Sequence, residues 1–246
     1  KAPIEMIEVV EEEASAVSGI LSLDVNTHFI SYGADIWGAG SNWSDALFNP
    51  LLELSFAIDD QLSFSLGTWW DVNDNAPSSI GDSIQEIDVW AGLSYETGKL
   101  TTSLLYQAWM YGSSTEQIID LIFALDVPLS PSLTIHGRVD PGASGGDNGV
   151  VPVLGIEIPI VETDGFSLSA PVNLAFATDG FHAGDGGFAY TSAGLSVAVP
   201  LAFIDSKFGE WSLNTGVTYY YTNSDVIPLN PDESFLTGSM GVSVAF

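Results

Sequence analysis

The sequence contains no cysteine and very few basic residues. Among its 246 residues, only 4 are Lys or Arg, against 32 Asp and Glu, which gives a formal net charge of −28. The absence of cysteine excludes disulfide bonds and thiolate metal sites. The scarcity of positive charge excludes a broad phosphate-binding surface, so we expect no nucleic-acid partner and no basic patch for anionic lipid headgroups.

Long apolar runs are also lacking, although 46% of the residues are hydrophobic. No run approaches the roughly 18 residues that a membrane-spanning helix needs. The opening residues, KAPIEM, lack the apolar region of a signal peptide, so we expect a chain that is cytosolic or already processed. The chain is too apolar for disorder, and its length allows one large all-β domain or two smaller ones.

One pattern repeats along the chain instead. Segments of roughly ten to fifteen residues alternate apolar with small or polar residues, as β-strands with two unlike faces do. In the last segment, the large apolar residues from Leu236 to Phe246 lie on one face, opposite Thr, Ser, Gly and Ala. About twelve such segments are present, at 18–33, 46–58, 61–73, 85–97, 100–112, 117–128, 133–141, 150–162, 166–178, 188–203, 211–223 and 235–246.

The connections and the outward aromatic residues favour a membrane barrel over a soluble β-sandwich, which remains the alternative. Short connections follow even-numbered segments, and longer loops rich in Gly, Asp, Asn and Pro follow odd-numbered ones. Strands of roughly ten to thirteen residues, with aromatic residues near both ends of the apolar face, match transmembrane β-strands. We therefore predict an all-β, transmembrane, antiparallel up-and-down β-barrel of about 12 strands, with short periplasmic turns and longer extracellular loops.

The final strand, GVSVAF at 241–246, resembles the last strand of bacterial outer-membrane β-barrels of the porin type. The resemblance implies an outer-membrane location, periplasmic termini and closure of the barrel by the first and last strands. It also implies that the barrel assembly machinery reads a signal ending at Phe246. Members with twelve strands include nucleoside channels, oligosaccharide channels and a phospholipase, so the resemblance leaves the activity open.

Two domains are expected, an acidic N-terminal segment at 1–17 and the barrel at 18–246. The segment APIEMIEVVEEEASAV has apolar residues near helical spacing and Pro3 where a first helical turn would begin. It could form a short helix in the lumen or at the periplasmic mouth, and a disordered acidic tail is the alternative.

If Phe246 faces lipid, the alternation predicts which side chains face the lumen. Three tryptophans on neighbouring strands then point inward in the half nearer the long loops. We interpret them as a constriction or as lumen packing. The alternative is a platform that stacks on a sugar or nucleoside while carboxylates bind its hydroxyls. The predicted group consists of Trp69, Trp90, Trp109, Tyr111, Asp71, Asp88 and Gln107.

Further inward charges predict that the lumen attracts cations and repels anions, although part of the negative charge must lie in loops. Arg138, the only arginine, is expected to pair with Asp126 or Glu157 across adjacent strands, and a substrate clamp is the alternative. The predicted lumen charges are Asp24, Glu53, Asp120, Asp126, Arg138 and Glu157.

One loop resembles a calcium site. In DVNDNAPSSIGD, the side chains of Asp71, Asn73, Asn75 and Asp82 stand at positions 1, 3, 5 and 12 of a calcium loop. Ala76 replaces the glycine expected there, and strands rather than helices flank the loop. Ca²⁺ at acidic extracellular loops could also bridge to lipopolysaccharide phosphates, and no other cofactor is expected.

Hydrolase motifs such as GxSxG and HExxH are missing, and the three histidines lie far apart, so we predict that the chain is not an enzyme. The sequence predicts a porin-like outer-membrane channel for passive diffusion of small polar solutes, with a preference for cations. The alternatives are a sugar or nucleoside channel that uses the tryptophans, and a non-conducting structural or adhesive barrel. Expected partners are outer-membrane lipids, lipopolysaccharide, the assembly machinery and, in a homo-oligomer, further copies of the chain.

Overall fold

The computed structural model describes residues 16–37 and 43–246. The helix or tail predicted in the N-terminal segment falls on residues 1–15 and lies outside the described residues. Within the described part, no helix is long and apolar enough to cross a membrane.

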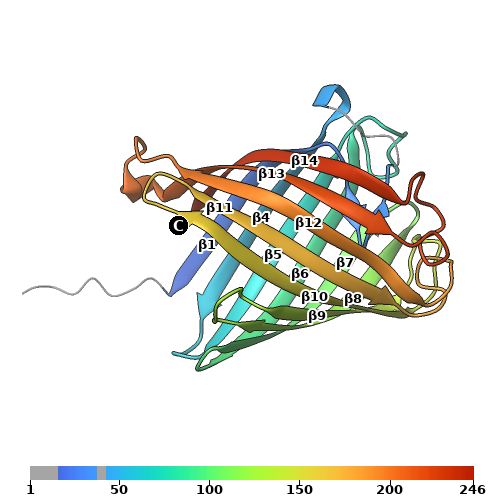
Figure 1. The fold of residues 1–246 in the computed structure, drawn as a ribbon, viewed down its shortest axis with the longest axis horizontal. Coiled ribbons are helices and arrows are strands. Elements are labelled where there is room, and N and C mark those ends of the chain that lie inside the picture. Colours follow the sequence, from blue (N-terminus) through green and yellow to red (C-terminus); the bar gives the residue numbers. More distant parts are fainter. Residues whose placement is uncertain (1–15, 38–42) are drawn as a thin grey trace, which may run out of the picture.

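Twelve antiparallel strands of the described chain close into a barrel, which confirms the predicted fold class (Figure 1). Each strand pairs with its neighbours in sequence, and β1 pairs with β14 to complete the ring. The barrel strands are β1 (Val17–Asn26), β4 (Leu47–Ala57), β5 (Leu62–Val72), β6 (Ile84–Thr97), β7 (Leu100–Tyr111), β8 (Ser114–Leu125), β9 (Ser132–Asp140), β10 (Gly149–Glu162), β11 (Ser167–Ala177), β12 (Gly187–Pro200), β13 (Glu210–Thr222) and β14 (Ser234–Ala245).

Closure of the barrel involves the last residue directly. Gly19 and Phe246 exchange two backbone hydrogen bonds, with N···O distances of 2.7 and 3.0 Å. The Phe246 ring lies over Gly19, because a Cβ atom at that position would come within 2.6 Å of the ring. Phe246 shares the outward face with Val242 and Val244, whereas Ser243 bonds to Ser212 inside the barrel. The outward orientation of Phe246 is therefore as predicted.

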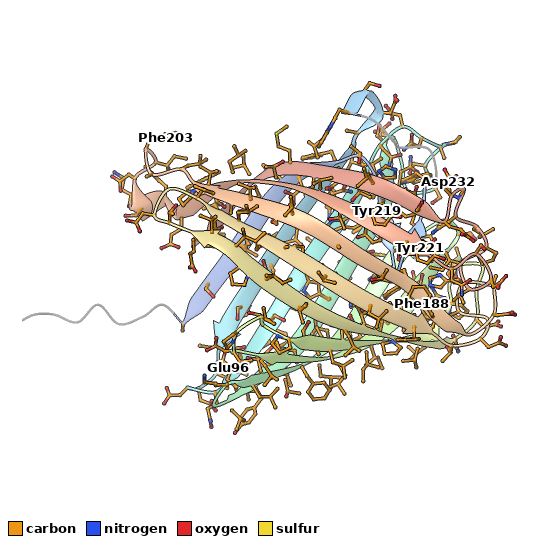
Figure 2. The ribbon with its side chains drawn as sticks, in the orientation of Figure 1. Glu96, Phe188, Phe203, Tyr219, Tyr221 and Asp232 are labelled. Atoms are coloured by element: carbon orange, nitrogen blue, oxygen red, sulfur yellow. The ribbon has the colours of Figure 1, made fainter. Side chains whose placement is uncertain are left out.

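The outer surface is apolar between two sets of aromatic residues. Leu104, Leu154 and Leu195 are each about half exposed on this surface. Figure 2 shows Phe188, Tyr219 and Tyr221 near one end of the barrel and Phe203 at the other. An apolar band with aromatic residues at both edges is the surface that a membrane barrel presents to lipid.

We call the two ends of the barrel the loop end and the turn end. The loop end carries the connections 27–46, 73–83, 112–113, 141–148, 178–186 and 223–233, and the turn end carries 58–61, 98–99, 126–131, 163–166 and 201–209. Glu96 and Phe203 mark the turn end in Figure 2, and Asp232 marks the loop end.

The lengths of two connections differ from the prediction. At the loop end, β7 joins β8 through Gly112 and Ser113 alone, and Gly112 has the positive φ (56°) that favours a tight hairpin turn. At the turn end, 201–209 is longer than expected and contains the 3₁₀ helix η2 (Ser206–Phe208). A second 3₁₀ helix, η1 (Trp43–Asp45), precedes β4.

The first predicted strand is also too long. It was expected to span 18–33, but β1 ends at Asn26, and the chain then forms a small hairpin of β2 (Ile30–Ser31) and β3 (Ala34–Asp35). Tyr32 and Gly33, at the turn, both have positive φ values, 51° and 88°. Two left-handed residues in succession make a tight hairpin turn. The chain therefore reverses within a segment that the alternation predicts to be one strand.

A buried apolar cluster lies inside the barrel at the loop end. Phe181, Val226 and Ile227, from two loops, pack against inward residues of β10, β11 and β12, and Tyr32 and Ala34 of the hairpin pack against the same cluster. Three connections thus fold into the barrel mouth. The inward strand residues of the cluster are Val151, Ala175, Ala177 and Ala189.

Candidate functional site: the lumen and the hairpin across it

Polar contacts fix the hairpin segment, residues 27–37, inside the barrel. Thr27 exchanges hydrogen bonds with Gly238 of β14, through its backbone N (2.9 Å) and its hydroxyl (2.8 Å). Asn230 accepts from the Asp35 backbone and donates to the Gly33 carbonyl, each at 2.9 Å. Trp37 donates to Asp71 of β5 at 2.7 Å. These hydrogen bonds therefore hold the segment to the side of the barrel formed by β14, β1, β4 and β5.

Tyr32, at the hairpin turn, contacts three other rings. It stacks on Trp109 of β7, with centroids 5.3 Å apart and an angle of 18°. Its ring also packs edge-on against His136 of β9 (4.6 Å) and Phe181 of the β11–β12 loop (5.4 Å). The His182 side chain hydrogen-bonds to the Tyr32 backbone. Burial lowers the pKa of His182 to about 4, so this imidazole is neutral at physiological pH.

Two cavities lie on either side of Tyr32. The inner cavity, of about 600 Å³, is lined by residues from most of the barrel strands, including Asn26, Trp69, Asp88 and Thr218. The outer cavity, of about 320 Å³, is lined by loop-end residues and by Glu86, Tyr111, Glu116 and Arg138. Both cavities share the lining residues Phe29, Ser31, Tyr32 and Trp109. The hairpin segment and Trp109 therefore separate the lumen from the mouth.

Four members of the predicted tryptophan group meet in the inner cavity. Asp88 of β6 pairs in register with Trp69 of β5 on one side and with Trp109 of β7 on the other. Trp69, Asp88, Gln107 and Trp109 all line the inner cavity. The carboxylate of Asp88 thus lies between two indole side chains on the lumen wall.

The remaining members lie above or below that row. Trp90 donates its indole N–H to Glu53 of β4 at 2.7 Å, and it covers the inner face of Gly67. Tyr111 lines the outer cavity and donates its hydroxyl to Glu116. Asp71 is fully buried.

Arg138 pairs with Glu116, so the predicted partners are wrong. The Nε–Oε1 distance is 2.5 Å, the guanidinium donates to the Phe181 carbonyl at 2.6 Å, and it lies 3.7 Å from the centroid of the Phe181 ring. Arg138 stands near the loop end of β9, whereas Asp126 lies beyond β8 in the exposed turn 126–131. Glu157, towards the turn end of β10, accepts a hydrogen bond from Ser169 instead.

The other predicted charges line the wall. Asp120 accepts from Gln107 (2.6 Å) and lies 2.9 Å from His136 Nδ1. Asp24 accepts from Ser22 on the inner face of β1. Asp126 is the exception, since its place in a turn removes it from the lumen wall.

The sequence reading missed two buried carboxylates, Glu86 and Glu116. Glu86 shares the inward face of β6 with Asp88 and pairs in register with Tyr111. Glu116 precedes the predicted strand, which begins at 117, whereas β8 begins at Ser114. Both have the same parity as predicted lumen residues on their strands, and that parity was the available signal. The buried carboxylates of the wall are Asp71, Glu86, Asp88, Glu116 and Asp120.

In the proposed calcium loop, the side chain expected to be the first calcium ligand, Asp71, already accepts hydrogen bonds from other residues. The Asp71 carboxylate accepts from Trp37, Asn49 and Asn73, at 2.7 to 3.0 Å. Asn73 Oδ1 accepts from the Asn75 backbone, and Asp82 is exposed on the loop. Across residues 16–37 and 43–246, no group of three or more His, Asp or Glu side chains could hold a metal ion. Calcium at the acidic loops stays a prediction.

Two of the three histidines, His136 and His182, both contact Tyr32. His28 stacks on Phe235 (5.9 Å) and lies 3.8 Å from Asp35, while His136 faces Asp120 and His182 faces the Tyr32 backbone. The predicted absence of catalysis also stays a prediction.

The architecture defines a class: a closed twelve-stranded antiparallel barrel with an apolar outer surface and an acidic lumen. No protein-family model matches the chain, and no curated protein matches it. Among solved structures it is similar to the KdgM porin, with 9% identity, 93% of this chain and 99% of that chain covered, and a TM-score of 0.51. The structure of the KdgM porin in complex with disordered oligogalacturonate shares 10% identity with this chain. The match covers 93% of this chain and 99% of that chain, with a TM-score of 0.51. The NanC porin shares 11% identity with this chain, and the match covers 91% of this chain and 98% of that chain with a TM-score of 0.50. At these identities, the similarity shows that the chain has the fold of outer-membrane porins.

Proposed function

We propose that this protein is an outer-membrane channel through which small polar solutes diffuse passively, with a preference for cations. The observation that carries the proposal is the excess of acidic over basic side chains on the lumen wall. Asp71, Glu86, Asp88, Glu116 and Asp120 are buried there, and the only arginine of the chain is paired with Glu116.

The wall should act on ions through its field as well as through contacts. Carboxylates on low-dielectric walls create a negative potential that concentrates cations and excludes anions from the passage. Two of the other basic residues, Lys99 and Lys207, lie in turn-end connections, away from this part of the wall. Arg138 therefore pairs with only one of the five buried acidic side chains of the wall.

The charge also argues against one class of solute. The KdgM porin has been solved in complex with oligogalacturonate, which is a polyanion. A polyanion would meet repulsion from the acidic lumen of this chain. The shared fold is therefore consistent with a channel, and the wall charge supports a solute of opposite sign.

The hairpin supports a narrow passage. On β12, β13 and β14, the inner cavity is lined by Tyr190, Thr218, Tyr220 and Ser239 among others. Because Tyr32 separates this cavity from the outer one, solutes must pass beside the ring or displace it. We expect a small conductance.

Planar-bilayer recording across a KCl gradient tests the proposal. We expect steady conductance and a reversal potential displaced towards that of K⁺. Glu53→Gln removes one lumen charge but keeps an acceptor for Trp90, so it should bring the reversal potential closer to zero. Asp164→Asn, in the exposed β10–β11 turn, makes the same charge change outside the lumen and should leave the reversal potential unaltered. A reversal potential near that of Cl⁻ would refute the cation preference.

A second candidate is a non-conducting structural barrel. The buried apolar cluster around Phe181 and Ile227 at the loop end favours it, because such packing seals a barrel mouth. The same recordings separate the two candidates, since a sealed barrel gives no current over the full voltage range.

We also infer that the turn end and both termini face the periplasm and that lipopolysaccharide surrounds the loop end. The two aromatic edges of the outer surface support the membrane location. With so few basic residues, the acidic loops would need Ca²⁺ to contact lipopolysaccharide phosphates. Melting of the barrel in lipopolysaccharide-containing micelles should then occur at a lower temperature after chelation, and unchanged melting would count against calcium.

A further inference from the structure

Asp88, which lines the inner cavity, carries a buried oxygen atom without a hydrogen-bond partner. The residue is 8% exposed, and its Oδ1 atom has no hydrogen-bond partner among the described residues. Leaving a carboxylate oxygen buried and unpaired costs stability unless a bound group compensates it. The inner cavity, which Asp88 lines, has room for such a group.

The surroundings of Asp88 favour a positively charged group. Glu86 lies two residues away on the same inward face of β6, and Asp71 and Glu116 lie close enough to repel a negative charge on Asp88. The one guanidinium nearby, that of Arg138, is already engaged by Glu116 and by the Phe181 carbonyl. A cation in the cavity beside Asp88 would reduce this repulsion, whereas an anion would increase it.

Aromatic rings surround the same point. Trp69 and Trp109 flank Asp88 on the neighbouring strands, which lie about 10 Å apart across β6. Phe29 packs on Trp69 (4.9 Å between centroids) and Tyr32 stacks on Trp109 (5.3 Å). The hairpin segment therefore contributes two further rings beside those of the strands. We call Phe29, Tyr32, Trp69 and Trp109 the aromatic box, and all four line the inner cavity.

A carboxylate inside an aromatic box distinguishes between kinds of cation. Small inorganic ions keep a tight hydration shell, whereas weakly hydrated organic ammonium groups bind well to aromatic faces. Arg138 illustrates this preference in the same lumen, since its guanidinium lies over the Phe181 ring while Glu116 holds one edge.

We propose that the aromatic box and Asp88 form a binding site for small solutes that carry an organic ammonium group. This inference deepens the proposed channel function and rests on it. The ammonium group lies beside Asp88 and against the indole rings, and the polar part of the solute faces Gln107 and Asn49 on the cavity wall. The cavity of about 600 Å³ falls within the usual range for small-molecule sites.

Choline and tetramethylammonium are the probes for a test on the full-length barrel in planar bilayers. We expect either probe to reduce the K⁺ current in a saturable manner. Asp88→Asn is nearly isosteric and relieves repulsion, so it should fold, and it should weaken the block by about tenfold, the effect of one lost charge-assisted contact. Trp109→Leu should weaken it as well.

Glu157→Gln is the matched control, since it removes a lumen carboxylate near the turn end, away from the aromatic box. It should change the reversal potential for K⁺ against Cl⁻ but leave the affinity for choline within twofold of the parent, about 0.4 kcal/mol. Equal effects of Asp88→Asn and Glu157→Gln on choline would overturn the site and show that only general lumen charge attracts the probe.

The outcomes separate the site from the channel. If the K⁺ preference is present but neither probe blocks, the site is wrong and the channel function stands. If no current is seen, the channel function fails, and titration calorimetry of choline on the barrel in detergent decides the site alone. Saturable binding that Asp88→Asn weakens supports the site, and no heat of binding refutes it.

Discussion

Substitution of Arg138 by glutamine should strongly destabilise the barrel. The change removes the 2.5 Å ion pair with Glu116, the 2.6 Å hydrogen bond to the Phe181 carbonyl and the contact with the Phe181 ring at 3.7 Å. Glu116, which is 2% exposed, would keep only the Tyr111 hydroxyl as a described partner. Breaking one side of a buried pair costs about 3–5 kcal/mol, mostly because the other charge stays buried.

The double variant Arg138→Gln with Glu116→Gln separates this cost from the loss of ordinary contacts. It leaves no unpaired charge, so it should recover more than half of the stability that Arg138→Gln loses. The assay is urea unfolding of the barrel in lipid vesicles, followed by tryptophan fluorescence. If the single variant proves no less stable than the double variant, the charge on Glu116 is not what makes Arg138 important, and the reasoning fails.

Three further predictions concern the hairpin, the closure and the loop end. Tyr32→Ala removes the ring that separates the two cavities, so the single-channel conductance should rise, and an unchanged conductance would show that the passage runs elsewhere. Gly19→Val places a side chain against the Phe246 ring, so insertion into vesicles should slow and heat-modifiable migration on gels should show less folded barrel, whereas Gly216→Val on β13 serves as a strand-glycine comparison without that ring. The folded barrel holds the pKa of His182 at about 4, below the ordinary 6.5, so the barrel should be fully stable above about pH 6.5 and lose stability as the pH drops towards 4. His182→Gln should flatten this part of the curve of stability against pH. A curve for the unmodified protein that shows no such loss would contradict the burial of His182.

The barrel itself could be predicted because a two-residue period fixes the faces of every strand. Once Phe246 is outward, parity alone places Asp88 inward, and antiparallel pairing then brings Trp69 and Trp109 to either side of it. The meeting of these three side chains in one cavity depends on parity and on the register of adjacent strands. The two-residue turn 98–99 fixes the register of β6 and β7, whereas the longer loop 73–83 joins β5 to β6.

The hairpin was not predictable from the same pattern. The alternation of β1 continues to Phe29, and the reversal depends on left-handed conformations at Tyr32 and Gly33. A tyrosine with positive φ gives no sequence signal of a turn, since Asn, Asp and Gly are the usual residues there. The contacts that hold the hairpin, such as those with Asn230 and Gly238, come from the far end of the chain.

The partner of Arg138 was missed for a related reason. An ion pair across strands depends on how far each strand is shifted along the barrel, and β8 starts earlier than the pattern indicated. The tight connection at Gly112 and Ser113 brings Glu116 onto the wall beside Arg138, whereas Asp126 moves into the opposite turn.

The reversal potential of the unmodified protein in a KCl gradient tests the central claim most directly, because it measures the effect of all lumen charges together. The account predicts a value displaced towards the K⁺ equilibrium potential, with a displacement that shrinks as total salt rises and screens the wall carboxylates. A value at zero, or one displaced towards the Cl⁻ potential, would contradict it.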